Sequence, residues 1–348
     1  MSFPSYWLFI AALFALSLFA NAKARGGKME KSNKDKLQLE ACQAVKAKIA
    51  SLEQGGLPPD VADQFFKAYG LERGEAHAQV FAKDVNNCNT ACYVFTPQNP
   101  KACVMLVHGY LDHAMAWRKI VPQLLKGGYM VLLYDLPGHG FSDGARADIG
   151  DFGEYREQLA HMAEFAGGYG LRLHVIAHST GAGILADLLL HDKEHAEKLA
   201  SAVLIAPLLH SAHWEISRIG VEFWPGKSVG RKFRENSSDP SFKDFQKADP
   251  LQYDSIPLSW TKANETWAKR MLDSDSVYGG DNVLFIQGKK DKVVDWKFNI
   301  DVYRRKFPKA TVSMYEEGQH QLMNESPRML DSLTDEILKW LEKEQEGR

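Results

Sequence analysis

The chain has 348 residues, of which 45% are hydrophobic and 25% charged, and these values exclude a disordered or fibrous protein. The length favours one large α/β domain with an insertion, or two modest domains. The 42 lysines and arginines nearly balance the 44 aspartates and glutamates, so the chain has no basic field to hold a nucleic acid.

The first 22 residues carry no charged side chain and end in Ala20-Asn21-Ala22, an A-x-A pattern that signal peptidases cut. A cleaved signal peptide is one interpretation, although its usual basic n-region is missing. An uncleaved anchor is the other, since residues 3–22 just reach the roughly 20 apolar residues of a membrane span. The basic residues that follow favour a cytoplasmic downstream side. We therefore predict either an exported protein, periplasmic or secreted, or a protein that is anchored to the membrane through residues 3–22.

An N-terminal helical extension is predicted over residues 23–75. Residues 23–56 are rich in Lys, Ala, Gln and Glu and end at a Gly-Gly pair, and Pro58-Pro59 begins a short amphipathic helix through residues 60–69. From about residue 76 two strand-like runs flank the Asn-rich turn 86–89, which predicts a hairpin.

Continuous apolar runs then alternate with helical stretches. The runs are ACVMLVHG, YMVLLYD, LHVIAHS, SAVLIAP, NVLFIQG and TVSMYEE. Such runs between helices are typical of a parallel sheet buried on both faces, with right-handed crossovers. The predicted fold is therefore α/β, with a mostly parallel, doubly wound core over residues 76–207 and 273–348.

Residues 208–272 break this alternation and are too many for an ordinary connection. Their large aromatic side chains are Trp214, Phe223, Trp224, Phe233, Phe242, Phe245, Trp260 and Trp267. We predict an inserted helical lid over an apolar ligand. The alternative is that these rings form the small core of the insertion itself.

The four cysteines, Cys42, Cys88, Cys92 and Cys103, form no metal-ligand pattern. They would allow two disulfides in three connectivities in an exported protein, and the pairing stays open. In the alternative, Cys103 at least is a buried apolar residue of a strand.

Ser179 follows the run LHVIAH and opens a helix, with the small residues Ala177 and Gly181 on either side. A serine in a sharp strand-to-helix turn is the nucleophile elbow of α/β-hydrolases, where small neighbours avoid a clash. The usual first glycine is replaced here by Ala177. The position predicts a nucleophilic hydroxyl over the end of the sheet.

A serine hydroxyl needs a base, and the base needs an acidic partner that orients it. His320 follows the run TVSMYEE, and Asp291 follows NVLFIQG, with Asp295 as a rival. Both positions follow strands, where an open α/β sheet gathers its functional residues. The backbone amides of Thr180 and Tyr110 are the expected oxyanion hole for a tetrahedral intermediate.

Several motifs in one order carry a resemblance to a known superfamily. They are VHGYLDHAMAWR, YDLPGHGFSDG, the Ser179 elbow, LIAPLL, GKKDKVVD and EEGQHQLMNE. Over about residues 76–345 the chain resembles the α/β-hydrolases, and it is similar to their monoacylglycerol lipase and lysophospholipase branch, also labelled serine aminopeptidase-like. The resemblance implies Ser179 as nucleophile, Asp291 as orienting acid, His320 as base and the amides of Tyr110 and Thr180 as oxyanion hole. Tyr110 is bulkier than the residue common at its position.

Two further motifs are predicted to support this site. Asp112-His113 would make a local polar contact that orders the oxyanion loop, and residues 324–327 would hold the loop of His320 in place.

The sequence thus predicts a serine hydrolase that cleaves carboxylic esters through an acyl-enzyme, without metal or organic cofactor. The expected substrate is a fatty acyl ester of glycerol or a lysophospholipid, and we predict membrane association and no nucleic acid partner. A small-ester carboxylesterase or thioesterase is the alternative among enzymes. A non-catalytic, membrane-tethered binding protein of the same fold is the alternative from another class.

Overall fold

The computed structural model describes residues 33–49 and 56–346. Within them, an eight-stranded sheet runs in the order β1-β2-β4-β3-β5-β6-β9-β10. Its strands are β1 (His77–Val85), β2 (Cys88–Thr96), β3 (Ala102–Val107), β4 (Tyr129–Tyr134), β5 (Leu173–His178), β6 (Leu199–Ile205), β9 (Val283–Gly288) and β10 (Thr311–Tyr315). β1 and β2 pair antiparallel, as do β2 and β4, whereas every pair from β4 to β10 is parallel. The predicted fold class is confirmed.

The hairpin of β1 and β2 closes through a two-residue turn, since Val85 pairs with Cys88. The turn residues Asn86 and Asn87 have φ values of 53° and 60°. Asparagine tolerates positive φ, and a tight hairpin needs it at both turn positions because the turn must match the strand twist. The Asn-rich sequence therefore forms the expected turn.

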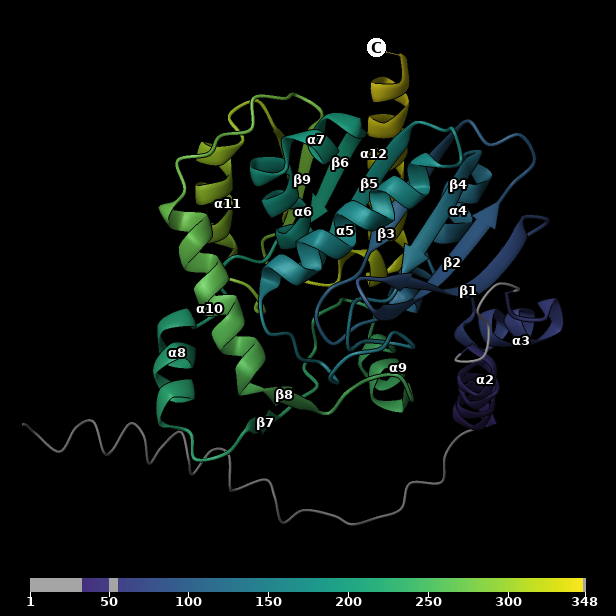
Figure 1. Ribbon diagram of the computed structural model, residues 1–348, viewed down its shortest axis with the longest axis horizontal. Helices are drawn as coiled ribbons and strands as arrows, with labels where there is room; N and C mark the ends of the chain where they lie inside the picture. The colour runs from purple at the N-terminus through teal and green to yellow at the C-terminus, as the bar shows by residue number, and fades with distance from the viewer. Residues whose placement is uncertain (1–32, 50–55, 347–348) are drawn as a thin grey trace, which may run out of the picture.

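Helices cover both faces of the sheet (Figure 1). One face carries α5 (Phe152–Gly167), α6 (Thr180–His191), α7 (Lys193–Lys198) and α11 (Trp296–Lys306), and the other carries α2 (Asn33–Ile49), α3 (Pro59–Tyr69), α4 (Val121–Lys126) and α12 (Pro327–Glu346). Along β3, Cys103, Met105 and Val107 pack into the first core, and Val104 and Leu106 pack into the second. Successive side chains of a strand point to opposite faces, so a strand covered on both faces must be apolar throughout.

A separate layer is inserted between β6 and β9. It contains α8 (Trp214–Phe223), β7 (Ser228–Gly230), α9 (Phe242–Ala248), β8 (Ser255–Pro257) and α10 (Leu258–Asp273). These elements lie together below the sheet in Figure 1, and β7 pairs antiparallel with β8. We call residues 208–272 the insertion.

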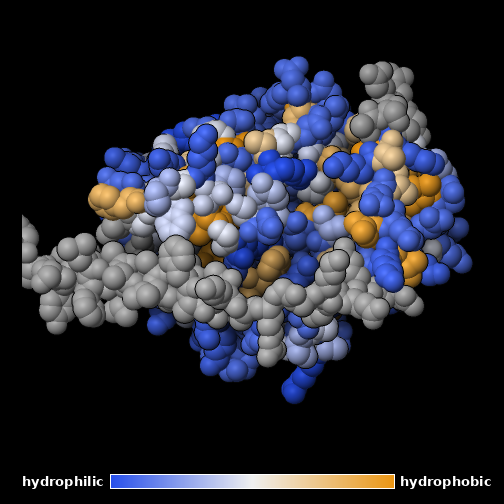
Figure 2. Space-filling view, turned by 90° about the horizontal axis from the view of Figure 1, so that it is seen from below, coloured by the Kyte–Doolittle hydropathy of each residue, from blue (hydrophilic) through white to orange (hydrophobic). Residues whose placement is uncertain are grey.

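Seen from below, the molecule shows hydrophobic residues in separate patches among hydrophilic ones (Figure 2). The exposed large apolar side chains of the insertion are Phe223, Trp224, Tyr253 and Leu272. By contrast, Trp260 and Trp267 are buried against the core. Some aromatic side chains of the insertion therefore pack in the protein interior, which is close to the alternative interpretation that these rings form a core.

All four cysteines are free, and Cys103 is fully buried in β3. Burial raises the pKa of the Cys103 thiol to about 12, so this side chain is an apolar core residue and no nucleophile. The structure therefore contains neither of the two disulfides that the sequence would allow.

Within residues 33–49 and 56–346, no helix is both long and apolar enough to cross a bilayer. The expected signal peptide or anchor at residues 1–22 lies outside the described residues and stays a prediction.

Candidate active site

The turn between β5 and α6 places Ser179 at the end of the sheet. Its φ of 53° and ψ of −114° are rare for a residue with a side chain, and such strain persists only where the surroundings hold it. A Cβ at position 181 would lie 2.6 Å from the carbonyl oxygen of His108 and 2.8 Å from that of Val107. Only glycine fits there, whereas Ala177 is accommodated, fully buried, in β5.

The structure brings together Ser179, His320 and Asp291. His320 Nε2 lies 3.0 Å from Ser179 Oγ, and His320 Nδ1 lies 2.8 Å from Asp291 Oδ2. All three side chains are buried, and they follow β5, β10 and β9 respectively. Parallel strands end at one edge of a sheet, so residues up to 141 positions apart meet there. The hydroxyl, the imidazole and the carboxylate thus form one hydrogen-bonded chain.

Asp291 is held as a carboxylate. Its Oδ1 accepts the backbone N–H groups of Val293 at 2.7 Å and Val294 at 3.2 Å, and Gln287 donates to its Oδ2 at 3.1 Å. Burial alone would raise the pKa of Asp291, but His320 and the two backbone donors outweigh it and hold this pKa below its usual value. The negative charge favours the His320 tautomer whose Nδ1 carries the proton, which leaves Nε2 free to accept from Ser179.

Asp295, the rival acid, has a different position. It caps the N-terminus of α11, where its Oδ1 accepts the backbone N–H of Phe298 at 3.3 Å. An N-terminal cap is a stabilising role. The geometry therefore favours Asp291 as the partner of His320.

The loop that carries His320 is fixed from two sides. His178 Nε2 lies 3.0 Å from the carbonyl oxygen of His320, and the buried Glu325 accepts the backbone N–H of Gln319 at 2.7 Å. Burial, helped by the nearby His320, lowers the pKa of His178 to about 3, so His178 is neutral and its Nε2–H donates. The predicted motif 324–327 thus contacts this loop through Glu325.

Two backbone amides lie beside Ser179. Thr180 is the first residue of α6, and a Cβ at position 109 would lie 3.0 Å from Ser179 Cβ, so the chain entering Tyr110 passes against the elbow. The Tyr110 ring stacks on Trp260 of α10 with centroids 3.6 Å apart, and its hydroxyl donates to the carbonyl oxygen of Ala147 at 2.7 Å. The bulky side chain at this position is therefore packed against the insertion.

His113 makes the local contact that was expected, because its Nδ1 accepts the backbone N–H of Met115, and Asp112 and His113 also make contacts that are distant in sequence. Gln321 donates to Asp112 at 2.8 Å, and His113 Nε2 lies 2.7 Å from Asp249 Oδ2 of the insertion. Tyr69 of α3 donates to Asp249 Oδ1 at 2.6 Å. Sequence reasoning missed Asp249 and Tyr69, because a partner 136 residues away leaves no local pattern.

The pKa of His113 is raised by its carboxylate neighbours. Burial alone would lower its pKa, but the charge and hydrogen bond of Asp249, with Asp135 and Asp112 nearby, outweigh burial and raise it. The backbone N–H of Met115 donates to His113 Nδ1 at 3.4 Å, so Nε2 carries the proton that Asp249 accepts. This buried hydrogen bond, which becomes an ion pair when His113 is protonated, connects the core and the insertion.

This ion pair predicts a pH-dependent stability. We expect His113→Gln to lower the free energy of unfolding by about 3 kcal/mol at pH 6, because it leaves a buried charge unpaired. Because the pKa of His113 is higher in the folded than in the unfolded protein, its protonation stabilises the fold, and this contribution is complete below the unfolded-state pKa of 6.5. The contribution is lost as the pH rises through the folded-state pKa. Urea unfolding of both proteins at pH 6 and pH 9 should show a smaller difference at pH 9. A difference that grows with pH would contradict the ion pair.

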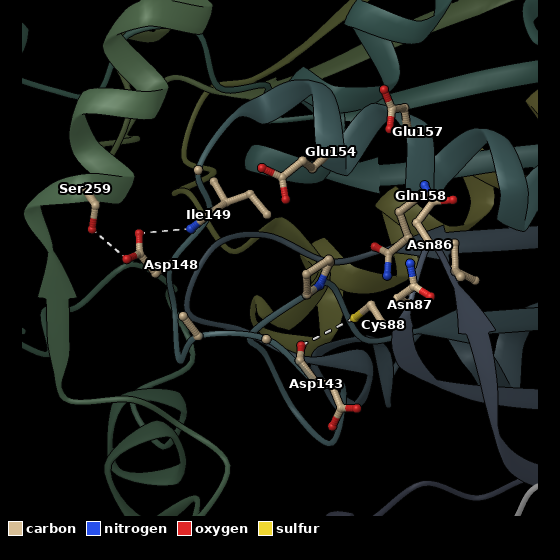
Figure 3. A pocket seen from close by; sticks show the side chains of 15 residues that line it. Asn86, Asn87, Cys88, Asp143, Asp148, Ile149, Glu154, Glu157, Gln158 and Ser259 are labelled. Carbon is tan, nitrogen blue, oxygen red and sulfur yellow. Dashed lines mark hydrogen bonds between the residues drawn. The ribbon is translucent and has the colours of Figure 1, made fainter.

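A cavity of about 620 Å³ lies apart from Ser179, His320 and Asp291 (Figure 3). The turn of β1 and β2, the loop before α5 and Ser259 of α10 line it, and its carboxylates are Asp143, Asp148, Glu154 and Glu157. The Ser259 hydroxyl donates to Asp148 at 2.6 Å across one side. This acidic cavity is not part of the site around Ser179.

Comparison with known proteins shows similarity over most of the chain. A family model described as Serine aminopeptidase, S33, matches residues 98–327. Monoglyceride lipase of Homo sapiens is 26% identical over 263 residues, which are 70% of this chain and 82% of that protein. A soluble variant of monoglyceride lipase from Saccharomyces cerevisiae has the same fold, with a TM-score of 0.69 at 17% identity, over 79% of this chain and 98% of the other. A bacterial membrane phospholipase A covers 98% of this chain, and is itself covered to 97%, with a TM-score of 0.57 at 18% identity.

Proposed function

The chain belongs to the serine aminopeptidase S33 family of α/β-hydrolases, and on this premise we propose that it is a serine hydrolase of fatty acyl esters. The proposal rests on two contacts of His320, whose Nε2 lies 3.0 Å from Ser179 Oγ and whose Nδ1 lies 2.8 Å from Asp291 Oδ2. They are the pattern of nucleophile, base and orienting acid. The relatives named monoglyceride lipase support an ester as the substrate.

The reaction starts when His320 Nε2 takes the Ser179 proton while Oγ attacks the ester carbonyl carbon. The amides of Tyr110 and Thr180 bind the negative oxygen of the tetrahedral intermediate. The imidazolium then gives its proton to the departing alcohol oxygen, which leaves an acyl group on Ser179. Water repeats the sequence, with His320 again as base, and releases the fatty acid and the free serine. Asp291 keeps its charge and stabilises the imidazolium in both halves.

The direct test is covalent labelling by a fluorophosphonate probe. Only an activated serine reacts, so the intact protein should take up one probe per chain, and mass spectrometry should locate it on Ser179. A binding protein of hydrolase fold would stay unlabelled and would not turn over esters.

The insertion favours a long acyl chain over a small ester. It begins directly at the elbow, because the backbone N–H of Leu208 donates to the Ser179 carbonyl oxygen at 3.0 Å. Beyond it, His210 stacks between Trp214 and Phe298, with ring centroids 4.2 Å and 4.3 Å away. Aromatic side chains at the start of a segment that begins at the elbow are suited to an apolar substrate.

We therefore expect p-nitrophenyl esters of medium or long chains to be better substrates than the acetate. Each buried methylene contributes at most about 0.8 kcal/mol, so kcat/KM should rise by up to roughly tenfold for two carbons. Rates across a series from acetate to palmitate check this. A maximum at acetate would instead favour a small-ester carboxylesterase or thioesterase.

For the head group of the substrate we propose two candidate classes, monoacylglycerols and lysophospholipids. A panel of glycerol and phosphocholine esters with one common acyl chain distinguishes them. Membrane association through residues 3–22, on the exported side, also stays our proposal. N-terminal sequencing of the soluble and membrane fractions tests it, since a soluble chain that starts at Lys23 excludes a permanent anchor.

A further inference from the structure

The loop between β3 and α4 is strained next to the nucleophile. It carries the Tyr110 amide, and the following residue, Leu111, has a φ of 62°. The left-handed region is unfavourable for a branched side chain, so this conformation persists only if neighbouring groups hold it. We call residues 109–114 the oxyanion loop.

Three parts of the insertion contact three residues of this loop. Trp260 stacks on the Tyr110 ring, and Arg231 donates to the Leu111 carbonyl oxygen at 3.3 Å. Asp249 pairs with His113 at 2.7 Å. The insertion therefore holds the oxyanion loop as well as lying beside the nucleophile.

The His113–Asp249 contact is the most buried of the three, with side-chain exposures of 2% and 0%. Asp249 is itself fixed, because Tyr69 donates to its Oδ1 at 2.6 Å and the Leu251 N–H at 3.0 Å. The Tyr69 hydroxyl in turn lies 3.4 Å from Cys42 Sγ of α2. This chain of contacts connects the N-terminal helices, through the insertion, to the oxyanion loop.

On the core side, the loop is fixed at the next residue. The Ala114 N–H donates to Asp135 Oδ1 at 2.7 Å, so His113 has the insertion on one side and the sheet on the other. Other charged groups around the pair are Asp112, Arg118 and Arg231, and the Arg118 guanidinium lies over the Phe245 ring of α9 at 3.8 Å. The position of His113 thus depends on Asp249.

We propose that Asp249 is a positioning residue for the proposed ester hydrolysis, which holds the Tyr110 amide in the oxyanion hole through His113. Asp249 touches no reacting atom. An oxyanion donor stabilises the transition state only where it is aimed at the developing charge, and a displacement of about 1 Å can cost a hundredfold in rate. Release of His113 lets the strained loop relax and moves this donor.

Asp249→Asn removes the charge and keeps the shape. We expect kcat to fall by about 10- to 100-fold, measured per fluorophosphonate-labelled site, with KM within about threefold of wild type. Counting labelled sites at the end point corrects for unfolded protein, so a loss of stability alone leaves this kcat unchanged. Tyr69→Phe removes only the hydroxyl that donates to Asp249, and it should lower kcat by about threefold. If Asp249→Asn does not fold, Tyr69→Phe tests the positioning role instead.

Arg270→Gln is the matched control. Arg270 of α10 also pairs with the core, at 2.7 Å from Asp151, but on the surface and away from the oxyanion loop. It should keep the wild-type kcat. A wild-type kcat in both Asp249→Asn and Tyr69→Phe, a change in KM alone, or an equal loss in Arg270→Gln would overturn the positioning role. If wild-type protein neither labels nor hydrolyses esters, it is the proposed function that fails.

Discussion

Ester turnover is expected to fall by about 10⁴-fold or more when Ser179 is replaced by alanine. The hydroxyl is the only group of the site that can form the acyl-enzyme, whereas the oxyanion amides and the substrate contacts stay in place. The fold should persist, because Ser179 donates no side-chain hydrogen bond except to His320 among the described contacts, and alanine is smaller. The measurement is kcat on a medium-chain ester, with circular dichroism as the control for folding.

Loss of fluorophosphonate labelling should accompany this loss of turnover. If Ser179→Ala keeps activity within tenfold of wild type, Ser179 is not the nucleophile and the proposed mechanism is wrong.

Asp291→Asn is expected to lower kcat by about 10³- to 10⁴-fold with little change in KM. The amide cannot stabilise the imidazolium, and it favours the His320 tautomer with the proton on Nε2, which cannot accept from Ser179. The matched variant, Asp295→Asn, changes an acid only four residues away that caps α11. It should cost less than about 1 kcal/mol of stability and leave kcat within threefold.

The reverse order, with Asp295→Asn inactive and Asp291→Asn active, would move the acid to Asp295 and contradict the geometry. Both proteins should be compared below their unfolding temperatures, so that the cap at Asp295 does not affect the rates.

The central sheet and the positions of Ser179, Asp291 and His320 were predictable because their signals are local. A buried parallel strand is a continuous apolar run, and a residue just after such a strand lies at the functional edge of the sheet. The small residues at 177 and 181 are a local signal of the elbow, although the groups that exclude a Cβ at position 181 are the carbonyl oxygens of Val107 and His108 at the end of β3.

The contacts that hold the oxyanion loop were not predictable in this way. His113 has the nearby partner that was expected, Met115, but its second partner, Asp249, lies 136 residues further along the chain, and Tyr69 lies on a helix that precedes the sheet. The insertion was predicted as helical, yet it also contains the three-residue strands β7 and β8. Such short strands carry too few residues for a periodic pattern.

The chain order of the site residues has a consequence for synthesis. Ser179, the proposed nucleophile, is made 141 residues before His320, the proposed base. At roughly 5–20 residues per second, the ribosome needs about 7–30 s to add those residues. During that time the elbow at Ser179 lacks the imidazole of His320, and β9 and β10, which precede Asp291 and His320, are made only towards the end of the interval. On the proposed mechanism, a nascent chain therefore cannot hydrolyse esters before His320 has been made and its loop has folded against Ser179.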